Sequence, residues 1–460
     1  MKKNPSHSED FDKQRLVISD LNTTNRNLFS VFFLSFAIGL FLSFEDLNIP
    51  HLEISTGFGS PYSAISWVFI LCLFLILRNG KFTVQIFATH RMKIFALFVF
   101  CITIINIVLS ELIIRGESTL IKSAKIAFYF LLAYSCLSVG YSLANLSNGI
   151  YLRIIGAVSF VLSSFGLLLD KFSSFDFTNI SIFHATPNLL YRDRGFSDEP
   201  STLALTLITS LVLLGFKNRS RFITFFMMLG LLFTVSFVQS RGLLPGLFTA
   251  VLILVSLNIV KNRHRTFRKI ILLVLVCLLI AANFYLSKLL SLAIWQTQRQ
   301  GISDTTRSFW GLLSAKSLEE YPLGCGLASS VTCTPNLVKS LTNSGFLLAT
   351  SEDFSEIRKF VFSNSDFMLI PKTWVSILAV HFGIVGVAIA YTLLTRSLSG
   401  IFLSSVSSSS FVWTLLVFIL LVTATVANSR ITSWGFYLAI GALLSLDHKN
   451  KEFTQNSSKY

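Results

Sequence analysis

The sequence predicts an all-α integral membrane protein with about twelve transmembrane helices. Three observations lead to this class. The 460 residues are 53% hydrophobic and only 13% charged, and the mean hydropathy is +0.67. The apolar residues come in long blocks, each able to cross a bilayer as a helix. Short polar connections separate most of these blocks, as packed helical hairpins require.

The expected spans follow from apolar windows of about 20 residues. They begin near Leu28, Tyr62, Ile94, Ile126, Ile150, Pro200, Phe222, Leu243, Ile270, Thr373, Ser409 and Ile431. The uncharged connection 144–149 and the serine-rich connection 397–410 leave the number open, so about 11 to 13 spans are expected. The first block lacks a small-residue cleavage site, which predicts that the preceding polar segment is retained.

The distribution of basic residues predicts the orientation. The chain has 38 Lys and Arg against 23 Asp and Glu, a net charge of +15. Basic residues concentrate in alternate short connections, notably 217–221 and 261–269, and the positive-inside bias places these connections and both termini in the cytoplasm. This bias explains the basic excess, so no nucleic-acid partner is expected.

This orientation divides the chain into five regions. They are a cytoplasmic N-terminal tail (1–27), transmembrane helices 1–9 (28–294), a large periplasmic loop (295–372), transmembrane helices 10–12 (373–446) and a cytoplasmic C-terminal tail (447–460). Apolar residues are scattered through the large loop, so we expect it to form a small helical cap and not a disordered tether. Long loops on a rigid scaffold commonly carry function.

Five arginines lie on the predicted outer side, against the positive-inside bias. They are Arg192, Arg194, Arg241, Arg307 and Arg430. A guanidinium group is a planar, permanently charged fork that suits phosphate oxygens, so several of them converging would bind a lipid-anchored diphosphate. The alternative for each is a side chain that reaches the lipid headgroups or pairs with a nearby acid.

Arg241 is the arginine for which a functional role is favoured. It lies in QSRGLLPG, in a connection too short for much other structure. Gly242 permits a close approach of the backbone, and Pro245 can open a helix early in the next span.

The segment RDRGFSDEPS, residues 192–201, precedes the sixth expected span. Pro200 suits the first helical position, and Asp198 and Glu199 lie at the positive end of the helix. This is also ordinary helix-start chemistry. However, glutamate is not a preferred cap, and Glu199 beside arginines could act as general base toward a sugar hydroxyl, with Asp198 as a further sugar contact.

In the large loop, DTTRSFWGLLSAKSLEEYPLGCG predicts an amphipathic helix before a Pro-Leu-Gly turn. Arg307, Trp310 and Leu313 share one face of this helix, where Trp310 could stack on sugar. The alternative for Trp310 is packing against the membrane domain. His381, inside the tenth span, is either a hydrogen-bonded core residue or part of the floor of the site.

Two of the six cysteines, Cys325 and Cys333, lie in the loop sequence CGLASSVTC. A periplasmic location permits oxidation, so they form either a disulfide or two thiols. The other four fall within expected spans, where a thiol behaves as a small apolar residue.

Several motifs are absent from the sequence. There is no GxxxxGK[ST] phosphate loop, no HExxH and no Cys/His cluster with zinc spacing. Neither a metal nor another cofactor is expected. The spans contain almost no ionisable residues, which is unusual for a proton-coupled transporter.

Three of these segments together resemble the superfamily of O-antigen polymerases and O-antigen ligases. GFSDEPS, QSRGLLPG, and TRSFW followed by YPLGCG occur in the order of that superfamily's external motifs, over roughly residues 192–326. The ligases carry a functional histidine in the large loop, whereas residues 295–372 contain none. The resemblance is therefore greater to the polymerases.

The resemblance implies an architecture like that of GT-C-type glycosyltransferases, in the bacterial inner membrane, and a metal-independent glycosyl transfer at the periplasmic face. The donor would be an undecaprenyl-diphosphate-linked glycan. Arg241 and Arg307 would bind the diphosphate, Arg194 would assist, and Glu199 would orient or deprotonate the acceptor. Membrane lipids and a chain-length regulator in the inner membrane are the candidate partners. The alternatives are a ligase, a flippase for lipid-linked oligosaccharide, and a non-catalytic scaffold.

Overall fold

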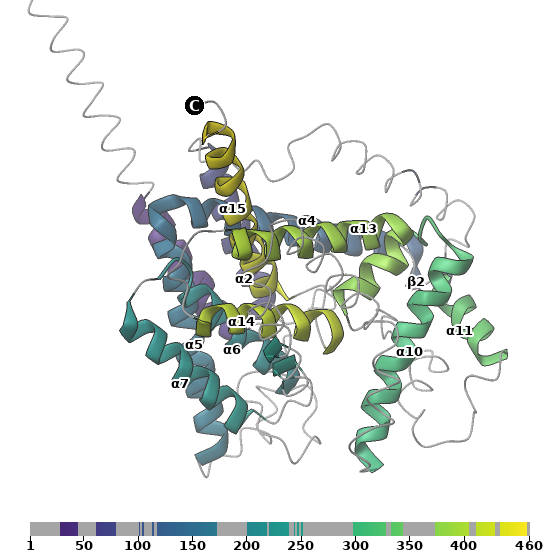
Figure 1. Ribbon diagram of the computed structural model, residues 1–460. Coiled ribbons are helices and arrows are strands. Elements are labelled where there is room, and N and C mark those ends of the chain that lie inside the picture. Colours follow the sequence, from purple (N-terminus) through teal and green to yellow (C-terminus); the bar gives the residue numbers. More distant parts are fainter. Residues whose placement is uncertain are drawn as a thin grey trace, which may run out of the picture.

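The computed structural model describes residues 28–44, 61–79, 101, 104, 113–114, 117–172, 200–218, 220–238, 243, 246–247, 250–251, 298–327, 333–343, 373–403, 411–427 and 433–457. Nearly all of them are helical, as predicted (Figure 1). The helices are the N-terminal helix Leu28–Ser43, α2 (Pro61–Asn79), α4 (Thr119–Asn145), α5 (Ile150–Phe172), α6 (Pro200–Leu214), α7 (Arg221–Phe237), α10 (Gln298–Glu320), α11 (Cys333–Asn343), α13 (Trp374–Leu403), α14 (Phe411–Val422) and α15 (Trp434–Ser457).

The structure also describes four short elements. The strands β1 (Ile113–Ile114) and β2 (Glu117–Ser118) form an antiparallel pair in which Ile113 faces Ser118. The 3₁₀ turn η2 (Leu146–Gly149) follows α4, and the π-helical segment η4 (Thr423–Ala427) follows α14.

Two helical stretches of the described residues are long and apolar enough to cross a membrane. They are Ser123–Phe172, which contains most of α4, then η2 and α5, and Trp374–Ser399 in α13. Shorter apolar helices include the N-terminal helix, α6 and α7. The expected starts near Ile94 and Ile270 lie outside the described residues, and around Leu243 only scattered helical positions are described. The number of spans therefore stays a prediction.

The connection 144–149, which left the number of spans open, is a turn between two helices. Ser147, Asn148 and Gly149 all have positive φ, the left-handed conformation that ends helices. Phe216 packs against Gly149, where a built Cβ would lie 2.7 Å from the ring. The chain therefore leaves α4 and begins α5 as a separate helix.

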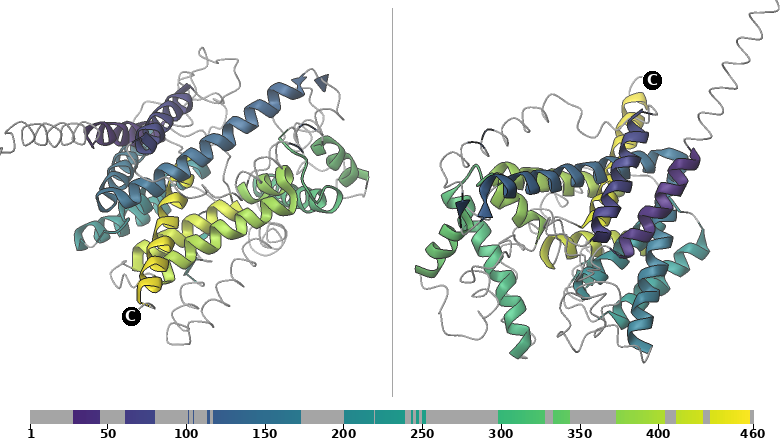
Figure 2. Two further views of the ribbon diagram at one scale, coloured as in Figure 1. Left: turned by 90° about the horizontal axis from the view of Figure 1, so that it is seen from above. Right: turned by 180° about the vertical axis from the view of Figure 1, so that it is seen from behind.

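Helix α15 packs against both α4 and α13. Helices α4 and α13 run in similar directions (Figures 1 and 2). Glycines allow the closest approach between α15 and α4. A Cβ on Gly140 would collide with the backbone oxygen of Leu438, and one on Gly441 would collide with that of Leu137. Such small-residue contacts are how helices associate in lipid, where burial of apolar surface does not drive them together.

Helix α13 is broken at Gly383, which has φ 57° and ψ −139°. The turn that follows α10 packs against α13 at this break and forms hydrogen bonds with its backbone. The amide of Ile384 donates to the carbonyl oxygen of Pro322 at 2.9 Å, and the amide of Cys325 donates to that of Val380, also at 2.9 Å. Backbone groups that the break releases thus find partners, as buried polar groups in a membrane domain must.

Candidate functional site

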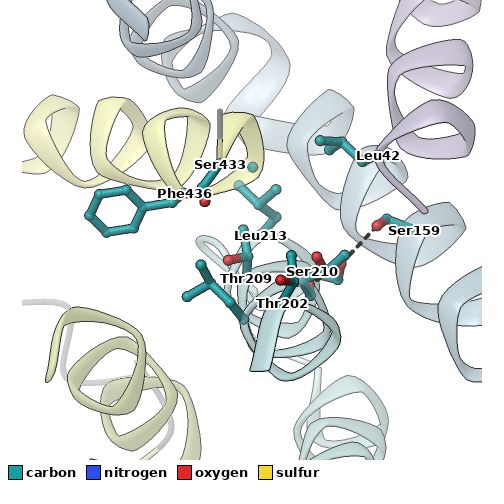
Figure 3. Close-up of a pocket in the computed structure, with 11 residues that line it drawn as sticks. Leu42, Ser159, Thr202, Thr209, Ser210, Leu213, Ser433 and Phe436 are labelled. Carbon is teal, nitrogen blue, oxygen red and sulfur yellow. Dashed lines mark hydrogen bonds between the residues drawn. The ribbon is translucent and has the colours of Figure 1, made fainter. Parts of the chain in front are cut away.

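The candidate site is a small pocket between the N-terminal helix, α5, α6 and α15 (Figure 3). Its volume is about 20 Å³, enough for one water molecule or one hydroxyl group of a ligand. The lining residues combine hydroxyl groups with aliphatic and aromatic side chains. They are Leu42, Ser159, Thr202, Leu205, Thr206, Thr209, Ser210, Leu213, Ser433, Gly435 and Phe436.

One face of α6 forms more than half of the pocket lining. Its six lining residues recur at intervals of three and four, which places them on one side of a helix. They are Thr202, Leu205, Thr206, Thr209, Ser210 and Leu213. An apolar helix buried in a membrane domain could fill this side with aliphatic residues, so four hydroxyls on the face that lines a pocket indicate a polar occupant.

The hydroxyl groups of the pocket fall into two classes. Ser210 is satisfied by a 2.7 Å hydrogen bond to the carbonyl oxygen of Thr206 and by a 2.9 Å bond that joins its hydroxyl to that of Ser159. Thr202 and Thr209 differ. Both are more than nine-tenths buried, and neither hydroxyl has a hydrogen-bond partner within the part of the chain that the structure describes. Buried polar groups normally have partners, so these two hydroxyls are available to a ligand.

The start of α15 packs against the middle of α6 at this pocket, where Gly435 lies next to Thr209. Helix α6 begins at Pro200, in the first helical position as predicted, and Thr202 in its first turn lines the pocket. Helix α15 begins at Trp434, and the neighbouring Ser433 and Gly435 line the same pocket. The lining residues of α6 extend from Thr202 to Leu213, so the pocket lies along the side of this helix, whereas α15 begins at the pocket and presents the positive end of its dipole there.

Most predicted site residues fall outside the described residues, namely Arg192, Arg194, Asp198, Glu199, Arg241 and Arg430. Arg307 lies within α10, but its side chain is not described. Chain connectivity still relates two of them to the pocket. Glu199 is three residues before Thr202, and Arg430 is three residues before Ser433. Residues three apart in a chain have Cα atoms within about 11 Å of each other.

The segment that follows Arg241 is also partly described. Leu243 is buried, and Gly246 faces Thr423, whose hydroxyl oxygen would lie 2.6 Å from a built Cβ. Thr423 begins η4, the π-helical segment that leads toward Arg430. Gly246 and Thr423, which lie in contact, are five residues after Arg241 and seven residues before Arg430 in the chain.

Trp310 lies in a small cluster formed by α10, α11 and α13. Its side chain is buried, and its ring packs edge-on against Phe309 with centroids 5.5 Å apart. Of the two roles that the sequence left open, the structure shows the packing role. Contact with sugar stays a prediction. Helix α10 ends before the Pro-Leu-Gly turn, as predicted from the sequence.

His381 is a hydrogen-bonded core residue, one of the two roles considered for it. Its side chain is buried, and Nδ1 lies 2.9 Å from the carbonyl oxygen of Gly326. Because a carbonyl oxygen only accepts, this bond requires the proton on Nδ1. His381 therefore holds the turn of the cap against the break in α13.

Cys325 and Cys333 lie close together and both carry thiol groups. Cys325 is in the turn after α10, Cys333 is the first residue of α11, and the two side chains form a hydrogen bond. Of the two states considered from the sequence, the structure has the two thiols, and the disulfide stays a prediction. The described residues contain no group of three or more His, Cys, Asp or Glu that could hold a metal ion.

Sequence reasoning missed the hydroxyl-bearing face of α6. The available signal was the spacing of Thr202, Thr206, Thr209 and Ser210, four hydroxyls on one side of an otherwise apolar span. Which neighbours this face would meet could not be read from the sequence. No protein-family model, no curated protein and no solved structure matches this chain.

Proposed function

We propose that this protein is an O-antigen polymerase, a metal-independent glycosyltransferase that joins undecaprenyl-diphosphate-linked repeat units at the periplasmic face of the inner membrane. The observation that carries the proposal is the meeting of α6 and α15 at one hydroxyl-lined pocket. The segments directly before these helices bear the candidate base Glu199 and the candidate phosphate ligand Arg430. Helices α6 and α15, which are far apart in the sequence, line this one pocket, and this contact supports a common site for the two candidates.

In the proposed reaction, a hydroxyl oxygen of the acceptor sugar attacks the anomeric carbon of the lipid-linked donor. The acceptor proton passes to the carboxylate of Glu199, the new glycosidic C–O bond forms, and the bond from the anomeric carbon to the diphosphate breaks. The diphosphate leaves with the electron pair. Arg241, Arg307 and Arg430, assisted by Arg192 and Arg194, would stabilise this charge, the main electrostatic contribution expected here.

The pocket has a limited role in this proposal, because its volume of about 20 Å³ does not admit a sugar ring. It suits one hydroxyl group of the acceptor, or a water molecule that bridges to it. Thr202 and Thr209 lie two helical turns apart on α6, about 10 Å along its axis, so one of these two hydroxyls would bind that group. A hydrogen bond between a threonine hydroxyl of the pocket and the acceptor sugar would orient the acceptor relative to Glu199.

The proposed setting is a protein of about twelve spans, similar to GT-C-type glycosyltransferases, with both termini in the cytoplasm and the large loop in the periplasm. Exposed apolar side chains support contact with lipid. Phe29, Phe32, Phe33 and Phe36 lie on one side of the N-terminal helix and are all exposed in the folded protein. Such a face suits lipid tails and not water. A chain-length regulator in the same membrane is the proposed protein partner.

The test is a gel of lipopolysaccharide from a deletion strain that is complemented with wild type, Arg241→Ala or Glu199→Gln at matched membrane expression. Arg221→Ala is the matched control, because Arg221 begins α7 on the predicted cytoplasmic side. We expect both site variants to lose the ladder and keep the band of core plus one repeat unit. The control should keep the full ladder.

Other outcomes identify the alternatives. Loss of every O-antigen band with accumulation of lipid-linked polymer means a ligase. Repeat units that stay on the cytoplasmic leaflet mean a flippase. A deletion strain with an unchanged ladder contradicts all three.

A further inference from the structure

The turn after α10 and the start of α11 hold two cysteine side chains against each other. Cys325 is fully buried and Cys333 is 5% exposed. Their thiol groups are hydrogen-bonded. The contact joins the turn after α10 to the start of α11, and seven residues separate the two cysteines in the chain.

The surroundings keep the two sulfur atoms in place. The cysteines belong to a small apolar cluster to which α10 contributes Phe309, Trp310 and Leu313, while α11 contributes Leu337, Val338 and Leu341, and α13 contributes Val380. The backbone amide of Cys325 is fixed by its 2.9 Å bond to the carbonyl oxygen of Val380. The two cysteines thus belong to one packed cluster and their side chains interact, which is the first condition for a disulfide.

We propose that Cys325 and Cys333 form a disulfide that fastens α11 to the turn on which α13 is broken. The proposal rests on the periplasmic placement of this loop in the proposed function. The oxidant is a disulfide-bearing protein of that compartment. One cysteine thiolate attacks the oxidant's disulfide to give a mixed disulfide, and the second thiolate displaces the oxidant, which leaves as a dithiol. Both cysteines thereby lose their protons, and two electrons pass to the oxidant.

The bond should form before the cap closes over the cysteines. In the folded protein, the hydrogen bond to Cys333 and then burial raise the pKa of the Cys325 thiol, so little attacking thiolate is present. The same burial keeps external thiols away from the finished bond. The disulfide is therefore structural, and it is not a switch that cycles in the folded state.

The disulfide would reinforce the contact between the cap and α13. Cys325 precedes Gly326, whose amide donates to the carbonyl oxygen of His381 at 3.0 Å and whose carbonyl oxygen is the partner of the His381 ring. A cross-link at Cys325 reduces the number of conformations that this turn can adopt in the unfolded chain. The disulfide would thus keep this turn in position to form hydrogen bonds with the backbone of α13 at the break near Gly383.

Trypsin offers a direct test on the full-length protein in membranes, because both cysteines fall in one tryptic peptide, residues 317–339. Membranes are denatured in iodoacetamide without reductant, digested and analysed by mass spectrometry. We expect an unalkylated peptide about 2 Da lighter than its dithiol form, since two hydrogen atoms have left. After reduction the same peptide should take up two alkyl groups. Two alkyl groups without reduction would overturn the proposal, as would a cross-link to any other cysteine.

Serine variants of the two cysteines distinguish a disulfide from two thiols that only pack together. Cys325→Ser and Cys333→Ser should each leave one alkylatable thiol in the peptide and lower the unfolding temperature by about 2–5 °C. Cys72→Ser, at an exposed position of α2, is the control that should change neither value. If reductant lowers the unfolding temperature of both single variants as much as that of wild type, the proposal is wrong. A lost glycan ladder with an intact disulfide contradicts only the proposed function.

Discussion

The imidazole Nδ1 of His381 lies 2.9 Å from the carbonyl oxygen of Gly326, and this hydrogen bond joins α13, a helix long and apolar enough to cross a membrane, to the turn after α10. The bond lies at the break in α13, where Gly383 interrupts the helix. Broken helices in membrane domains are tolerated where protein groups take over the released hydrogen bonds. Here the turn 321–327 supplies them, so this turn and α13 form one structural unit.

Removing the side-chain bond should destabilise this unit. We expect His381→Leu, which is similar in volume, to lower the free energy of unfolding by about 1–2 kcal/mol, because the carbonyl oxygen of Gly326 loses its buried partner. Thermal unfolding in detergent measures this. Thr392→Val, on an exposed part of α13, removes only a local bond to Ala388 and should change little. Equal effects of the two substitutions would mean that the contact between cap and helix contributes nothing.

The glycine at the break should tolerate no side chain. A Cβ at position 383 would collide with the carbonyl oxygen of Pro322, and the residue has a positive φ. We expect Gly383→Ala to cost at least about 2–3 kcal/mol and to reduce the amount of folded protein in membranes. Size-exclusion chromatography of a fluorescent fusion measures that amount. Ile384→Val at the exposed neighbouring position is the control, and a normal yield for Gly383→Ala would contradict this account of the break.

The glycine contact between α4 and α15 should be equally sensitive. Gly441→Leu would drive a side chain into the backbone of α4 at Leu137, at a cost of about 3 kcal/mol. Leu131→Phe enlarges a residue on the exposed side of α4 and should stay within about 0.5 kcal/mol of wild type. Chemical unfolding in detergent compares the two. If both behave alike, the helices do not depend on close backbone approach.

A substitution in the pocket should impair function without lowering the stability of the protein. Thr209→Val keeps the shape of the side chain and removes a buried hydroxyl that has no protein partner in the described structure. Stability should stay equal or rise by about 0–1 kcal/mol, while the glycan ladder shortens because a ligand contact is lost.

The control for this substitution is Thr234→Val in α7, a helix that does not line the pocket, where the hydroxyl donates to the carbonyl oxygen of Gly230 at 2.7 Å. That variant should lose a little stability and keep the ladder. A full-length ladder from a stable Thr209→Val protein would remove the pocket from the site.

The sequence determined the helical class, the apolar character of the helices, the start of α6 at Pro200 and the end of α10 before its Pro-Leu-Gly turn. These features depend on local composition and on the periodicity of short segments, which a single sequence displays directly. The closeness of Cys325 and Cys333 was foreseeable for the same reason, since only a short loop separates them.

Only the tertiary structure decided which of those segments meet. In the sequence, Gly383 is one glycine in an apolar stretch, and nothing marks it as a helix break. Thr202 and Thr209 are likewise two threonines in an apolar stretch, and nothing marks them as lining a pocket. The break needs the turn 321–327 as its hydrogen-bond partner, and the pocket needs α15, more than two hundred residues further along the chain, as its wall. Such partners are chosen by backbone hydrogen bonding and close packing between distant segments, and no local pattern records that choice.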